Sequence, residues 1–197
     1  MEPKLNNEML RWSSRLISEL KFDMAEANKL SSIIYNGLVS LPDETKNDFR
    51  RSSFISIKDR IDEMKAFQGW MVFANNIKNN PYITRAQVIT MNYICFVYLG
   101  NGLFKRLKSI FHSKSVTGKC CRFLLDNPIR AFRNAIAHGN WKYLPDFSGM
   151  EFWSQKGSDN NESYVKYVVS QEDLSFWQAL ARCTAYSTYL ALEEGTV

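Results

Sequence analysis

The chain has 197 residues, 45% of them hydrophobic, and a formal net charge of +5. This length and apolar content are enough for a sizeable buried core and exclude a disordered or fibrous protein, so we expect one domain over residues 1–197. The first residues lack the apolar run of a secretory signal, and the longest apolar-rich stretch, Tyr93 to Leu99, is too short to cross a bilayer. We therefore expect a cytoplasmic protein that does not enter a membrane.

The spacing of the cysteines is that expected of a protein in a reducing compartment. They lack the spacing of a zinc site, and two of them are adjacent, which makes a poor disulfide framework, so we expect buried, reduced thiols at Cys95, Cys120, Cys121 and Cys183. The chain has only two histidines, and no acids cluster beside them. The sequence thus predicts neither a metal site nor a cofactor.

The positive charge is concentrated between residues 101 and 142. Asp126 is the only acid there, so this segment carries +8 and the rest of the chain −3. Such a segment indicates a polyanionic partner such as nucleic acid, although a solvated basic face is the other interpretation. Its basic residues are Lys105, Arg106, Lys108, Lys114, Lys119, Arg122, Arg130, Arg133 and Lys142.

The first predicted element is a helix that runs from the first residues to Tyr35. Its apolar residues recur at three- and four-residue steps and form one stripe: Leu5, Met9, Trp12, Leu16, Leu20, Met24 and Ala27. Asn36-Gly37 breaks the pattern. A second long helix is predicted over about residues 46–78, and a third begins near Thr84.

Glycines interrupt the third helix at residues 100–102, where we expect a kink or a break before residues 103–111 continue. A polar loop is predicted over residues 113–118 and a helical turn over 119–125. Aromatic and β-branched residues at 150–154 and 163–169 predict a β-hairpin insert over about 150–169. A closing helix over 171–194 completes a mainly α fold, a helical bundle, with inner residues Leu174, Trp177, Leu180, Ala181, Thr184 and Leu192.

A short helix between Asn127 and Gly139 is the only stretch that looks like a site. Asn127 is expected to cap its first amides, Pro128 to occupy its first position and Gly139 to end it in the left-handed conformation. Helical spacing places one apolar face toward the bundle, formed by Ile129, Phe132 and Ile136.

The polar residues of this helix are Arg133, Asn134 and His138. An imidazole titrates near neutrality and suits proton transfer, and a guanidinium binds phosphate oxygens and stabilises charge developing on phosphorus. Arg133 and His138 are five residues apart, which separates them by about 140° and about 7.5 Å of rise. Either Arg133 extends around the helix, or the two residues meet across a dimer interface.

The segment Arg133-Asn134-Ala135-Ile136-Ala137-His138 resembles the arginine, polar residue, three residues, histidine signature of the HEPN superfamily. The resemblance implies a HEPN-like helical bundle. It also implies a metal-independent endoribonuclease that acts as a dimer, with Arg133 and His138 catalytic and Asn134 supporting. Many members belong to toxin–antitoxin, CRISPR-linked or antiviral systems, so an antitoxin or defence partner is implied. One subgroup has a tyrosine two positions after the histidine, where this chain has Asn140.

Cleavage of this kind uses the ribose 2′-hydroxyl as nucleophile and leaves a 2′,3′-cyclic phosphate and a 5′-hydroxyl. Around the site, Arg130 and Lys142 are candidates for phosphate contacts and Trp141 for stacking on a base. The other interpretations are that the two cations are only solvated and that Trp141 packs the turn after the helix. A non-catalytic HEPN-like module that binds RNA, a nucleotide or a partner protein is the alternative function.

Overall fold

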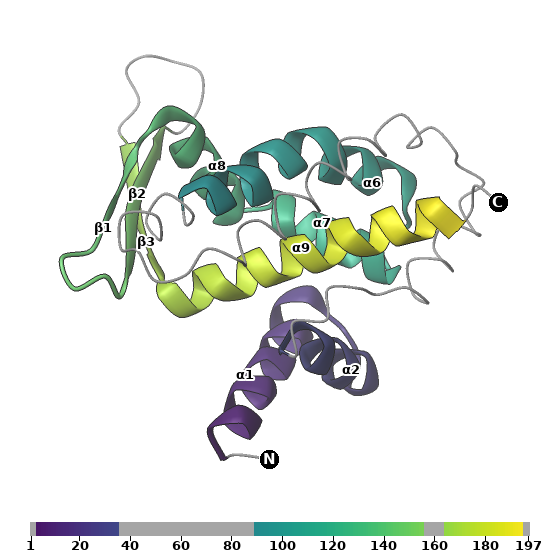
Figure 1. The fold of residues 1–197 in the computed structure, drawn as a ribbon. Helices are drawn as coiled ribbons and strands as arrows, with labels where there is room; N and C mark the ends of the chain where they lie inside the picture. The colour runs from purple at the N-terminus through teal and green to yellow at the C-terminus, as the bar shows by residue number, and fades with distance from the viewer. Residues whose placement is uncertain (1–2, 36–88, 156–163, 195–197) are drawn as a thin grey trace.

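The computed structural model, drawn in Figure 1, describes residues 3–35, 89–155 and 164–194. The predicted helix over residues 46–78, the start of the third helix and the loop at 157–161 lie outside these ranges. The helices are α1 (Pro3–Leu20), α2 (Met24–Tyr35), the π-helical segments η2 (Tyr93–Tyr98) and η3 (Gly100–Phe104), α6 (Lys105–Ile110), α7 (Val116–Leu125), α8 (Ile129–His138) and α9 (Gln171–Glu194). The strands are β1 (Trp141–Tyr143), β2 (Gly149–Gln155) and β3 (Tyr164–Ser170). The described chain is mostly helical, as predicted.

The core is organised around the ring of Phe132 in α8, whose side chain is fully buried. Its ring contacts Phe96 of η2 at a centroid distance of 5.4 Å, Phe152 of β2 at 5.0 Å and Trp177 of α9 at 5.9 Å, all edge to face. Such contacts favour the pair beyond the area that they bury. Phe132 therefore joins the two halves of the described fold, the helices and the sheet.

The sheet is antiparallel with the order β1-β2-β3 and packs beside the start of α9 (Figure 1). The predicted hairpin strands are confirmed as β2 and β3, which pair over their whole length. Side chains alternate along a strand, so Met150, Phe152 and Val169 are buried on one face. The prediction missed β1, because three residues are too few to show an alternating pattern.

The predicted first helix is wrong in one respect, because it is two helices. Lys21 has a φ of 61°, which ends α1, and Asp23 begins α2 with a reciprocal cap. The Asp23 Oδ1 accepts from the amide of Glu26 at 2.8 Å, and Glu26 Oε2 accepts from the amide of Asp23 at 3.3 Å. The break between α1 and α2 changes which positions of the predicted apolar stripe face the core. Met24, which was predicted to face inward, is 66% exposed.

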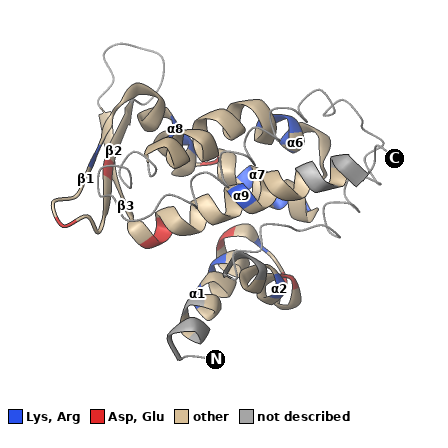
Figure 2. Ribbon diagram, viewed as in Figure 1, with Lys and Arg blue, Asp and Glu red and all other residues tan. Residues whose placement is uncertain are grey.

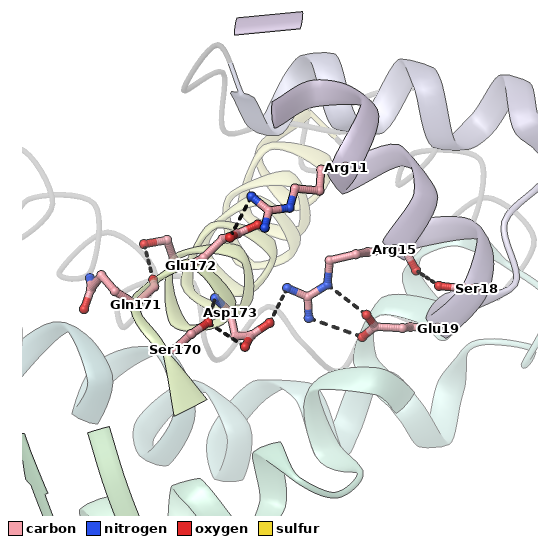
Figure 3. A network of polar contacts seen from close by, with 9 residues as sticks. Arg11, Arg15, Ser18, Glu19, Ser170, Gln171, Glu172 and Asp173 are labelled. Carbon is pink, nitrogen blue, oxygen red and sulfur yellow. Dashed lines mark hydrogen bonds and ion pairs between the residues drawn. The ribbon is translucent and has the colours of Figure 1, made fainter. Parts of the chain in front are cut away.

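Charged side chains hold α1 against the start of α9 (Figure 3). Arg15 Nη1 contacts Asp173 Oδ1 at 2.7 Å and Arg15 Nε contacts Glu19 Oε1 at 2.8 Å, while the guanidinium lies 4.4 Å from the ring centroid of Phe176. The Asp173 carboxylate also takes part in the cap of α9, since its Oδ2 accepts from Ser170 Oγ at 2.6 Å, while the Asp173 amide donates to that Oγ at 3.0 Å. One carboxylate thus serves both the helix start and the docking of α1.

Two glycine-containing stretches differ from their predicted structure. The stretch at residues 100–102 does not break the helix, because its backbone continues as η3. The predicted loop at 113–118 ends at Ser115, whose Oγ accepts from the amide of Gly118 and caps α7. Position 118, inside α7, requires glycine. A Cβ there would be 2.1 Å from the carbonyl oxygen of His112, a contact that only glycine avoids.

Helix α9 is confirmed, and five of its six predicted inner residues are buried; the side chain of Leu192 lies outside the described residues. The four cysteines are buried thiols, as predicted. Burial raises the pKa of Cys95 to about 12. In the described part of the chain, no helix has the length and apolar character needed to cross a membrane.

We expect Phe132→Ala to lower the free energy of unfolding by about 3–5 kcal/mol, because truncation leaves a cavity between η2, β2 and α9. Urea denaturation measures the change. Tyr164→Ala, at a ring that is 55% exposed, is the control and is expected to change it by less than about 0.5 kcal/mol. Equal losses in the two variants would contradict the central position of Phe132.

We expect the cysteines to resist Ellman's reagent in the native protein at mildly alkaline pH and to react once urea unfolds it. The thiolate is the reactive form, and burial with a raised pKa keeps Cys95 as the thiol. A Lys166→Cys variant places one thiol at a side chain that is 73% exposed and should react at once. Native wild-type protein reacting as fast as this added thiol would refute the expectation.

Candidate functional site

Helix α8 presents two unlike faces, as its sequence predicts. Ile129, Phe132 and Ile136 are 1%, 0% and 7% exposed, so this side is core. Arg130 and His138 are exposed on the other side, and Arg133 and Asn134 are half-buried between them. The burial of the apolar face therefore determines which polar residues of α8 reach the surface.

The predicted start of α8 is wrong. The helix begins at Ile129, with Pro128 directly before it, and no side chain caps it. Backbone carbonyls replace the expected Asn127 cap: the Asp126 oxygen accepts from the amide of Arg130 at 2.9 Å. The Pro128 oxygen accepts from the amide of Phe132 at 3.0 Å. Because these amides already have acceptors, the side chain of Asn127 is not needed there.

The predicted end of α8 is confirmed. Gly139 has a φ of 72°, and the amide of Asn140 donates to the Ala135 carbonyl at 2.8 Å, which closes the last turn. His138 is the last residue of the helix and its side chain is exposed. The imidazole is thus held at a rigid helix end and open to a ligand.

The guanidinium of Arg133 is turned toward Asn134. Nη2 and Nε donate to Asn134 Oδ1 at 2.8 and 3.2 Å, and Nη1 donates to Asn101 Oδ1 at 3.3 Å. Burial, and secondarily the charge of Arg130, lower the pKa of Arg133 from its usual value. An arginine remains charged at neutral pH in spite of such a shift, so the group stays a cation with two amide partners.

Asn101 is a member of this cluster that the sequence did not reveal. It lies in η3, and Gly100 beside it is so close to Arg133 that a Cβ would be 3.5 Å from Arg133 Cδ. The only signal was the Gly100-Asn101-Gly102 run, which indicated a break. A π-helical turn is rare and is frequent at functional sites. Here it carries an amide oxygen to the guanidinium from a second helix.

These contacts change the geometry expected from a helical wheel. On the wheel, with Ile129 at zero, Arg133 lies near 40°, Asn134 near 140° and His138 near 180°. The Arg133 side chain crosses this gap, because its guanidinium reaches the oxygen of Asn134. Asn134 and His138 are neighbours one turn apart. The structure thus brings Arg133 and Asn134 together, on the side of α8 where His138 is exposed.

The predicted RNA-contacting residues lie in different environments. Arg130 is exposed one turn before Asn134. The half-buried ring of Trp141 meets Tyr143 edge to face at 5.5 Å, with part of its surface open. Lys142 lies 3.6 Å from Glu151 on the neighbouring strand, and its side chain is 62% exposed. Arg130 is the least constrained of the three.

Metal-ligating side chains do not converge in the described ranges: no group of three or more His, Cys, Asp or Glu residues lies together there. The chemistry available on α8 is therefore that of a guanidinium, amides and an imidazole. This set can bind a phosphate, orient it and move a proton beside it.

We expect Gly139→Ala to lower the free energy of unfolding by about 1–2 kcal/mol, since the left-handed backbone that glycine adopts freely is unfavourable for alanine. Thermal or urea denaturation measures this. The control is Gly102→Ala in η3, where a Cβ would meet nothing within 4 Å. A loss in Gly102→Ala as large as that in Gly139→Ala would show that the backbone conformation of Gly139 is not the cause.

Comparisons with known proteins add no relative. No family model matches the chain, and neither the curated proteins nor the solved structures include a match. The resemblance to the HEPN superfamily therefore depends on the residues of α8 themselves, from Arg133 to His138.

Proposed function

We propose that the protein is a metal-independent endoribonuclease of HEPN type that cleaves RNA as a homodimer, within a defence or toxin system. One observation carries this proposal. The guanidinium of Arg133 is turned onto the Asn134 oxygen, one helical turn from the exposed imidazole of His138. A phosphate binder, a positioning amide and a proton carrier thus share one side of α8, at the spacing of the signature.

In this reaction His138 accepts the proton of a ribose 2′-hydroxyl, and the 2′-oxygen attacks the adjacent phosphorus. Arg133 stabilises the charge on the five-coordinate phosphorus, with Asn134 and Asn101 holding its guanidinium in place. The bond to the 5′-oxygen breaks, and that oxygen takes a proton from solvent or from an imidazolium. The products are a 2′,3′-cyclic phosphate and a 5′-hydroxyl.

A second copy of α8 supplies the acid in this scheme. A single imidazole cannot act as base and acid in the same step, and one chain places only one histidine at this helix. A two-fold axis beside the exposed face of α8 would bring two His138 side chains and two Arg133 guanidinium groups to one cleft. The proposed antitoxin or defence partner would act by covering or opening that cleft.

The basic segment supports an RNA partner. Lys105 and Arg106 are exposed on α6, and Arg130 is exposed on α8 close to the motif (Figure 2). Charges of one sign on α6 and α8 raise the local concentration of a polyanion, and their effect decreases with salt. Together with Trp141 and Lys142 at the end of α8, they form the surface along which we expect the RNA to lie.

The deciding experiment incubates labelled RNA with the protein in EDTA. Wild-type protein should cleave it and leave 2′,3′-cyclic phosphate ends. His138→Ala should lose activity by about 10²–10⁴-fold, the contribution of a general acid–base. His112→Ala is the matched control, because the only other histidine lies in the turn before α7, where its Nδ1 accepts from the amide of Lys114.

Cleavage that His138→Ala retains, or that EDTA abolishes, would contradict the proposal. RNA that is bound but not cut by wild-type protein, in a manner that requires Arg133, would favour the non-catalytic binding module instead.

A further inference from the structure

A hollow of about 760 Å³ lies at the opposite end of α8 from His138. We name it the α7 hollow; its walls are the end of α1, residues 113–114, α7 and the turn at 126–128. Helix α8 begins directly after this turn and is about 15 Å long, so the hollow is separate from the motif. Nothing in the proposed nuclease reaction uses it.

The lining of the α7 hollow is charged and mainly basic. Three of its cations belong to the basic segment recognised in the sequence, and one lies at the end of α1. The charged residues are Lys21, Lys114, Lys119, Arg122, Glu19 and Asp126. Four cations and two acids leave a positive balance around the space.

The two acids do not neutralise these cations, because both are engaged elsewhere. Glu19 contacts Arg15 at 2.8 Å, and Asp126 lies 3.6 Å from Lys108. Among the residues that the structure describes, Lys119 is the one cation of the four with a carboxylate partner, Glu26 at 3.2 Å. Lys21, Lys114 and Arg122 thus line the hollow without a carboxylate partner among the described residues.

Arg122 is the cation with the least satisfied side chain. Its Nη2 donates to the Phe111 carbonyl at 3.4 Å, a long contact, and its buried Nε has no hydrogen-bond partner in the described part of the chain. Buried donors normally have a partner, and a guanidinium forms its strongest bonds with a carboxylate or a phosphate. An anion in the hollow would give this half-buried guanidinium a stronger acceptor than the distant Phe111 carbonyl. Lys114, exposed at the same hollow, would supply a second cation.

Part of the remaining wall is apolar. Leu20 and the half-buried ring of Phe123 line the hollow, and Phe123 is held from behind by Phe176, edge to face at 6.2 Å. Small-molecule sites typically enclose about 300–1,000 Å³ and combine apolar walls with a few polar contacts. A ligand with a phosphate at one end and a ring at the other fits both the charge and the size of this space.

We propose that the α7 hollow binds a phosphate monoester of mononucleotide size. Arg122 and Lys114 contact the phosphate, and Phe123 with Leu20 contacts the base or sugar. The phosphate comes from a free nucleotide or from the 5′ end of an RNA, which share this chemistry. The proposal does not depend on the nuclease activity, since it involves none of the residues of the motif.

Calorimetric titration tests the site with adenosine 5′-monophosphate, adenosine, inorganic phosphate and a short RNA with or without a 5′-phosphate. We expect the monophosphate to bind at least about tenfold more tightly than adenosine, because the charge-assisted bonds go to the phosphate. Arg122→Gln and Lys114→Ala should each raise Kd by about tenfold or more. Tighter binding of the 5′-phosphorylated RNA than of the nucleotide would identify RNA as the source of the phosphate.

Lys166→Ala is the control, since it removes an exposed cation on β3 that does not line the hollow and belongs to neither proposed site. His138→Ala should bind the probes like the wild type even if it has lost cleavage, which separates the two sites. Thermal denaturation confirms that each variant is folded. The proposal is overturned if no phosphate-bearing probe binds, or if folded Arg122→Gln and Lys114→Ala bind these probes as Lys166→Ala does.

Discussion

The burial of Phe132 is the constraint on which the described fold depends. Its ring lies between Phe96, Phe152 and Trp177, so that η2, β2 and α9 all pack against the same side of α8. Rotating α8 about its axis would expose this ring and bury charge, at a cost of several kcal/mol. The orientation of every polar residue on the helix follows from this packing. The exposed polar face of α8 is thus a consequence of the hydrophobic core.

The polar face is completed by contacts between elements distant in sequence. The π-helical turn η3 brings Asn101 to Nη1 of Arg133, while Asn134 accepts from its other two nitrogens. A guanidinium held in this way loses little conformational freedom when it binds a phosphate. Preorganisation of this kind is what a nuclease without a metal requires, since its charge stabilisation comes from side chains alone.

The two ends of α8 have different surroundings and, in our proposals, different tasks. At its C-terminal end the exposed imidazole of His138 lies beside the sheet, whereas the turn before its N-terminal end forms part of the α7 hollow. The basic segment contributes to both ends, because it covers η3, α6, α7 and α8. Its charge is therefore divided between a surface for RNA and a hollow for a smaller phosphate, which separate substitutions can distinguish.

Local sequence determined the mainly helical fold, the hairpin strands and the closing helix. It also determined the inner face of α8 and the end of that helix at Gly139. Periodicity and a left-handed glycine act within a few residues, so both can be recognised in the sequence. It also contained the Asp23–Glu26 capping pair that divides the first helix, a signal that the apolar stripe obscured. Tertiary structure alone decided the rest. Position 118 requires glycine because the His112 carbonyl approaches it, and Asn101 reaches Arg133 because η2, which η3 follows, packs on α8. The α7 hollow is lined by segments that are distant in sequence, the end of α1 and α7 with the turns on either side of it. Such contacts depend on distances between elements, which no local pattern specifies.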